Sequence, residues 1–94
     1  MKISQEKIDK ISEQILYLLY SINPKSLFTS YIAKEIARDE EFVKKILLNL
    51  KLTKLVVEIK KNFKGDTYLR RSRWKISNIA YQIYQDHQTS KLSP

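Results

Sequence analysis

The sequence predicts a mainly α-helical fold with one β-hairpin (α+β), in the order helix, helix, helix, strand, strand, helix. Apolar residues recur at helical spacing up to about residue 50, which indicates three amphipathic helices. From residue 55 onward, β-branched and aromatic residues dominate and flank the only glycine, Gly65. A chain of 94 residues corresponds to one domain with one modest core. We expect the domain at residues 1–88 and a flexible C-terminal tail at residues 89–94.

The first helix is expected at residues 5–22, with Ser4 as its N-cap. Asn23-Pro24 ends it, because a residue that precedes proline is disfavoured in the α conformation. Its apolar side consists of Ile8, Ile11, Ile15, Leu18, Leu19 and Ile22.

Two shorter helices follow, separated by a short loop. Thr29 or Ser30 is the expected cap of the second helix, and Asp39 is the expected cap of the third. Glu40 and Glu41 lie in the first turn of the third helix, where the helix dipole favours acids. The buried side of the second helix is expected to be Ile32, Ala33, Ile36 and Ala37; that of the third, Val43, Ile46, Leu47 and Leu50.

The hairpin spans about residues 55–76, with Lys64 and Gly65 as the turn because glycine readily supplies a positive φ. This turn pairs Ile59 with Arg70 and Leu55 with Trp74. One face then carries Leu55, Val57, Ile59, Trp74 and Ile76. The other carries Lys60, Arg71, Arg73 and Lys75, with Glu58 opposite Arg71. A slip of one residue would exchange the faces of a strand.

A last helix is expected at about residues 78–88, capped by Ser77, with Ile79, Ala80, Ile83 and Tyr84 on its apolar side. The first and last helices have more apolar surface than a small core requires. Ile3, Leu16, Tyr20, Tyr81 and Tyr84 would remain for a partner. We therefore expect an isologous homodimer through the first and last helices.

The net charge of +8 is concentrated in one third of the chain. Residues 44–75 hold eleven basic and two acidic side chains, whereas the remainder holds seven basic and eight acidic ones. Seven of the basic residues lie in the stretch KKNFKGDTYLRRSRWK, at residues 60–75. Like charges this close repel one another, and a polyanion would relieve the repulsion and release counterions.

A set of positions within about residues 28–80 has a distinctive spacing: Ile32-Ala33, Val43, Leu47, Leu50, Leu55-Val56 and the run Trp74, Lys75, Ile76, Ser77. This spacing resembles that of the winged helix-turn-helix family, of the type found in small prokaryotic and archaeal transcriptional regulators. The resemblance implies binding of double-stranded DNA, with the third helix in the major groove and the basic hairpin, or wing, on the backbone or minor groove. The family often has glycine where this chain has Ala37 and Lys54, which predicts differently built turns.

The candidate DNA-binding residues follow from charge and helical position. Lys44, Lys45 and Asn49 lie on the outward side of the third helix, where lysine neutralises phosphates and asparagine reads adenine. The backbone near Ser30 and Tyr31 offers a further phosphate contact. The wing supplies Lys60, Lys61, Lys64, Arg70, Arg71 and Arg73. Tyr68 is a candidate for base stacking.

Two alternatives stay open beside a homodimeric DNA-binding regulator. Glu40 and Glu41, at the start of the third helix, would repel phosphates and favour a winged-helix protein-interaction module of replication or transcription machinery. The tyrosines leave open a binder of single strands or RNA.

An enzyme is not expected, because no nucleophile, base and metal set converges. We expect no cofactor and no metal site: Asp39, Glu40 and Glu41 point in different directions, and His87 is the only histidine. Without an apolar run of about 18 residues or a signal peptide, we expect no membrane and a cytoplasmic, nucleoid-associated location.

Overall fold

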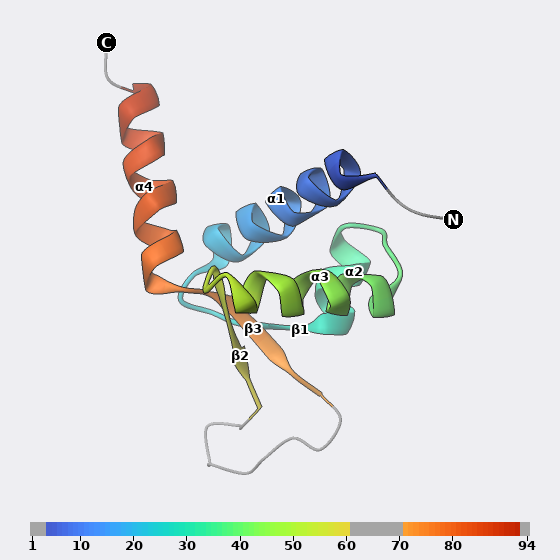
Figure 1. The fold of residues 1–94 in the computed structure, drawn as a ribbon. Helices are drawn as coiled ribbons and strands as arrows, with labels where there is room; N and C mark the ends of the chain where they lie inside the picture. The colour runs from blue at the N-terminus through green and yellow to red at the C-terminus, as the bar shows by residue number, and fades with distance from the viewer. Residues whose placement is uncertain (1–3, 61–70, 93–94) are drawn as a thin grey trace.

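The computed structural model describes residues 4–60 and 71–92. The elements are α1 (Gln5–Ile22), β1 (Leu27–Phe28), α2 (Thr29–Glu35), α3 (Glu40–Leu52), β2 (Val56–Ile59), β3 (Arg73–Ile76) and α4 (Asn78–Leu92). In Figure 1, α1 lies on one side of α2 and α3, the hairpin strands point away on the other side, and α4 extends away from the rest. The predicted order of four helices and a hairpin is confirmed, with β1 as an addition.

Three of the predicted helix caps are confirmed by side-chain hydrogen bonds. The bonds are Lys7 N to Ser4 Oγ at 3.3 Å, Phe42 N to Asp39 Oδ2 at 3.1 Å and Ala80 N to Ser77 Oγ at 3.1 Å. Each satisfies a backbone N–H that the first helical turn leaves without an intrahelical partner. The bounds of α1 are also the predicted ones, and its C-cap Asn23 has left the α conformation with ψ at 137°.

The start of α2 differs from the prediction because a third strand precedes it. β1 pairs antiparallel with β3, with Leu27 opposite Trp74 and Phe28 opposite Arg73, so the sheet order is β1-β3-β2. Phe28 is the N-cap of α2 and makes no side-chain capping bond, so the predicted Thr29 or Ser30 cap is wrong. The Thr29 hydroxyl instead accepts a hydrogen bond from Trp74 Nε1 at 2.8 Å, and so ties the start of α2 to β3.

The turns after α2 and α3 have the left-handed conformation that glycine usually adopts. φ is 55° at Ala37 and 64° at Lys54. After α2, Arg38 N donates to Ala33 O at 2.9 Å and Ala37 N to Lys34 O at 3.2 Å. An equivalent pair of backbone hydrogen bonds, 2.9 and 3.0 Å long, closes the end of α3. Both ends are Schellman motifs, so the prediction of differently built turns is wrong: backbone hydrogen bonds offset the steric cost of a Cβ.

The register of the hairpin differs from the predicted one by three residues. Ile59 pairs with Arg73 rather than Arg70, and Glu58 lies opposite Trp74 rather than Arg71. Because the shift is odd, β2 presents its other face to the core. Val56 is buried, whereas Val57, predicted inside, is 42% exposed. Trp74 and Ile76 are buried as predicted. The predicted turn at Lys64 and Gly65 lies outside the described residues.

One core joins α1, α2, α3, the sheet and the start of α4. Its buried apolar residues are Ile11, Ile15, Leu16, Leu19, Ile32, Ala33, Val43, Ile46, Leu47, Leu50, Val56, Trp74, Ile76 and Ala80. Leu16 is therefore a core residue, and its predicted role in a partner contact is wrong. Ile3 lies outside the described residues.

The helix α4 is longer than predicted and turned differently. It continues to Leu92, into the segment expected to be a tail. Ile79 and Ile83, predicted on its apolar side, are 66% and 58% exposed, while Tyr81 and Tyr84 pack against the core together with Tyr20 of α1. The end of α1 and the middle of α4 are therefore joined by tyrosines. Within residues 4–60 and 71–92, no helix has the length and apolar character needed to cross a membrane.

Candidate nucleic-acid interface

The exposed side of α3 carries the basic residues that the sequence predicted there. Lys44, Lys45 and Asn49 are exposed, while Val43, Ile46, Leu47 and Leu50 of the opposite side are buried. A helix anchored along one side presents the other as a rigid ridge, and such a ridge fits the major groove of B-DNA. Orientation and charge of α3 thus agree with the prediction.

A hollow of about 450 Å³ lies between the start of α2, the start of α3 and the hairpin. Its lining residues are Phe28, Thr29, Ser30, Tyr31, Glu40, Lys44, Arg71 and Ser72. Four of them, Ser30, Tyr31, Lys44 and Arg71, are sequence-predicted site residues, and they come from α2, α3 and the segment that precedes β3. The fold therefore brings a cation of α3 and a cation of the wing to one concave surface, which we call the α2–α3–wing hollow.

Arg71 is oriented by an aromatic residue that the sequence analysis did not single out. Its guanidinium carbon lies 5.8 Å from the centre of the Phe28 ring, within the range of a cation–π contact. Phe28 belongs to β1, which is too short for a periodic pattern to reveal. Arg71 itself is exposed, so the ring steadies the guanidinium while leaving its N–H donors accessible to solvent.

The remaining candidate residues are distributed around this hollow or fall outside the described residues. Lys60 is exposed at the end of β2, and Arg73 is half-buried on the central strand β3. Lys45 and Asn49 lie on α3 but do not line the hollow. Lys61, Lys64, Arg70 and Tyr68 lie outside the described residues.

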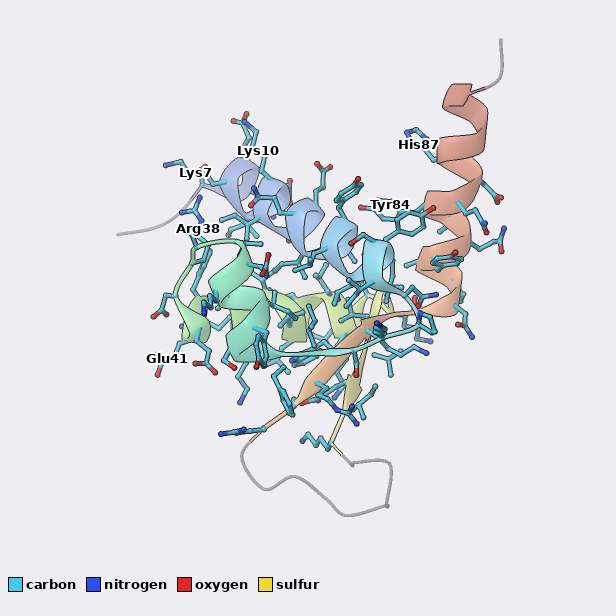
Figure 2. The ribbon with its side chains drawn as sticks, turned by 180° about the vertical axis from the view of Figure 1, so that it is seen from behind. Lys7, Lys10, Arg38, Glu41, Tyr84 and His87 are labelled. Atoms are coloured by element: carbon cyan, nitrogen blue, oxygen red, sulfur yellow. The ribbon has the colours of Figure 1, made fainter. Side chains whose placement is uncertain are left out.

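The acidic residues at the start of α3 take two roles. Asp39 caps the helix, and Glu40 lines the hollow beside Lys44. Glu41 is exposed at this end of the molecule, far from His87 on α4 (Figure 2). Across residues 4–60 and 71–92, no group of three His, Asp or Glu side chains is arranged to hold a metal ion.

Of three comparisons with known proteins, only the comparison with solved structures found a match. No protein-family model matches the chain, and no curated protein matches it. Staphylococcus aureus MepR in complex with DNA has a similar structure, with a TM-score of 0.72 and 23% identity over 89% of this chain and 66% of MepR. Lactococcus lactis ZitR, as a mutant in the apo form, has a TM-score of 0.69 and 22% identity over 92% of this chain and 60% of ZitR. The chain thus spans less than two thirds of the length of ZitR and of MepR in these two structures.

A further structure of S. aureus MepR, in its DNA-binding conformation, has a TM-score of 0.64 and 21% identity over 94% of this chain. The similarity in fold covers 89–94% of this chain in these three structures. The chain has the winged helix-turn-helix fold.

Proposed function

We propose that this protein binds double-stranded DNA as a homodimeric transcriptional regulator. In this proposal α3 enters the major groove, and the hairpin contacts the backbone or the minor groove next to it. Such a protein would act in the cytoplasm, with the nucleoid. The single observation that supports this best is the α2–α3–wing hollow, where Lys44 and Arg71 face the same space. Two cations on one concave surface can contact the phosphates of one duplex at the same time, which the same charges on opposite faces cannot do.

Each side chain has a distinct part in this proposal. Lys44 and Lys45 neutralise phosphates or reach guanine edges, and Asn49 reads adenine in the groove. The backbone N–H groups near Ser30 and Tyr31, at the start of α2, donate hydrogen bonds to a phosphate of the DNA backbone. Arg71 supplies a planar, multi-donor contact from the wing. Lys60, Lys61, Lys64, Arg70 and Arg73 are proposed to extend this contact along the wing.

The test is a titration with duplex DNA of mixed sequence at several salt concentrations. The variant Lys44→Ala with Arg71→Ala removes the two cations of the hollow. We expect weaker binding to every duplex and a slope of log K against log salt that is smaller by about 2, since each lost phosphate contact removes nearly one counterion. An unchanged slope would exclude the hollow from the DNA surface.

A charge-matched control is available on α1. Lys7 and Lys10 line a different hollow, together with Arg38 and Tyr17, and this hollow shares no lining residue with the α2–α3–wing hollow. Figure 2 shows Lys7, Lys10 and Arg38 on the same side of the molecule. The variant Lys7→Ala with Lys10→Ala removes the same charge from the protein. Its slope should stay close to that of the unchanged chain, because a general loss of charge releases no specific counterions.

The dimer is proposed to form through α1 and α4. The supporting features are Ile79 and Ile83, both exposed on α4, beside the tyrosines that join α4 to α1. Two copies would cover these side chains and present two α3 helices to two half-sites. Sedimentation of the unchanged chain should give a dimer, and Ile83→Glu should give a monomer that binds DNA more weakly. A monomeric unchanged chain would contradict this part.

A second candidate function is a winged-helix protein-interaction module of replication or transcription machinery. Glu40 supports it, because this carboxylate lines the hollow that would otherwise accept phosphate. The same salt titration separates the two functions. A protein-interaction module would bind DNA weakly and without saturation, with equal slopes for the hollow variant and the α1 control.

A further inference from the structure

A nearly buried carboxylate lies where α3, β2 and β3 meet. The side chain of Glu58 on β2 is only 5% exposed. Its Oε1 accepts a hydrogen bond from Lys51 Nζ at 2.8 Å, and its Oε2 accepts one from Ser72 Oγ at 2.5 Å. Lys51 lies in the last turn of α3, and Ser72 immediately precedes β3. One carboxylate therefore ties the end of α3 to both strands of the hairpin.

Ser72 continues this connection to the start of α2. Its carbonyl oxygen accepts a hydrogen bond from Thr29 N at 3.3 Å. Thr29 is the first residue of α2, and its hydroxyl accepts from the buried Trp74 side chain. The residue before Ser72 is Arg71, whose guanidinium lies over Phe28. The bonds of Ser72 thus fix the backbone from which Arg71 enters the α2–α3–wing hollow.

Simple electrostatics does not explain an acid at this position. A carboxylate near a phosphate-binding surface opposes binding, and taking it out of water is costly unless it is well hydrogen-bonded. Burial would raise the pKa of Glu58, but the hydrogen bonds from Lys51 and Ser72 and the charges of Lys51 and Lys60 hold it below its ordinary value. The group stays ionised and accepts two directional bonds, which suits a role in orientation.

We propose that Glu58 is a positioning residue for DNA binding, which holds Ser72 and hence Arg71 toward the hollow that Lys44 lines. This inference rests on the proposed function. It assigns a favourable role to an acid whose charge alone would weaken the binding of DNA.

The test compares two variants that remove the same charge. Glu58→Gln breaks the charged bonds at the junction, whereas Glu35→Gln changes an exposed glutamate at the end of α2. We expect Glu58→Gln to bind duplex DNA about tenfold more weakly, since charge-assisted bonds of this kind are strong. Its slope of log K against log salt should fall by about 1, as one phosphate contact is lost. Glu35→Gln should bind as tightly as the unchanged chain or slightly more tightly.

A second variant tests the same contact without changing the charge. Ser72→Ala should lower the salt slope in the same way, and the double variant should lose little more than either single one, because both act through one bond. Far-UV circular dichroism establishes that each variant is folded. A merely structural role would lower the thermal midpoint and leave the slope unchanged.

The outcomes separate this inference from the proposed function. If the unchanged chain does not bind duplex DNA, both fail. If the unchanged chain binds with a steep salt slope while Glu58→Gln and Ser72→Ala keep that slope, the role of Glu58 alone is overturned.

Discussion

The two ends of the molecule are held together by different kinds of contact. At the α2–α3–wing hollow, polar side chains distant in sequence are joined by hydrogen bonds, as between Trp74 and Thr29 or between Ser72 and Glu58. At the α1–α4 end, aromatic rings pack together: the ring centres of Tyr20 and Tyr81 are 5.1 Å apart, and those of Tyr20 and Tyr84 are 5.6 Å apart. Directional hydrogen bonds stabilise the first end, whereas the contact area of packed aromatic rings stabilises the second.

This difference matches what each end is proposed to do. Hydrogen bonds weaken steeply with angle, so they fix how a side chain such as Arg71 is aimed. Apolar contact is nearly indifferent to direction and is proportional to area, so an aromatic and aliphatic surface can extend onto a second copy of the chain. Changes at the hollow end should therefore alter DNA affinity out of proportion to stability. Changes at the α1–α4 end should alter stability or assembly first.

The largest effect is expected at Trp74, which belongs to the core and to the hollow end at once. Its side chain is 0% exposed. Trp74→Ala should lower the free energy of unfolding by about 3–5 kcal/mol through lost contact and a cavity. Trp74→Phe keeps an aromatic ring but leaves the Thr29 hydroxyl without this donor, at a cost of about 1–3 kcal/mol. Urea unfolding measures both, and a Trp74→Phe variant as stable as the unchanged chain would show that the hydrogen bond contributes nothing.

A smaller effect is expected from the tyrosines of the α1–α4 end. Tyr20→Leu keeps apolar bulk but removes the ring contacts with Tyr81 and Tyr84, for a loss of about 0.5–1.5 kcal/mol in unfolding free energy. Tyr17→Leu is the matched control, since Tyr17 is 59% exposed on the same helix. It should change stability by less than about 0.5 kcal/mol. A control as destabilising as Tyr20→Leu would mean that ring packing does not join α1 to α4.

Local signals were enough to predict that four helices form and to place three of their caps, because caps and apolar stripes act within a few residues. They did not predict the start of α2 or the exposed side of α4. Ser4, Asp39 and Ser77 cap the helices for which they were predicted. The exposure of Lys44 on α3 follows from the same periodicity. The hollow as a site could be anticipated only in part, since its cations were visible in the sequence but Phe28 was not.

The hairpin register could not be predicted, because non-local contacts decide it. The predicted turn placed Val57 inside, yet Val56 is buried, and β3 is paired on its other side by β1. Because the observed register differs from the predicted one by an odd number of residues, Glu58 lies on the face where it accepts hydrogen bonds from Lys51 and Ser72. An alternating pattern of residues fits both faces of a ribbon, so the contacts with α3 and β1 select between them.

A smaller effect on stability is expected in the turn after α2, where a residue other than glycine adopts a left-handed conformation. Ala37 has φ at 55°, a conformation in which its Cβ is crowded. Ala37→Gly removes the steric cost of the Cβ but increases the conformational entropy of the unfolded chain. The net result should be a free energy of unfolding that is higher by about 0.5–1 kcal/mol. Lys34→Gly, within α2, should lower it by about 1 kcal/mol. A stabilising Lys34→Gly or a destabilising Ala37→Gly in thermal unfolding would contradict the Schellman geometry.

The smallest effect on stability is expected from a change of pH. Low pH should destabilise the hollow end, and high pH should destabilise the α1–α4 end. Because the pKa of Glu58 is lowered below 4.5 in the fold, its contribution to stability is present above that ordinary value and is lost as the pH falls through the lowered pKa. Burial, assisted by the charge of Glu13, raises the pKa of Tyr84 above 10.0, so its contribution is present below pH 10.0 and is lost as the pH rises through the raised pKa.

Thermal midpoints from about pH 3 to about pH 11 report both transitions, since they bracket the ordinary pKa values of the two groups. Glu58→Gln should flatten only the acid side of the profile and Tyr84→Phe only the alkaline side. One variant that flattened both sides would mean that the ends are coupled through the core. In that case the hydrogen bonds that orient Arg71 would depend on the packing of α4. The two ends would then not be stabilised independently by hydrogen bonds and by apolar contact.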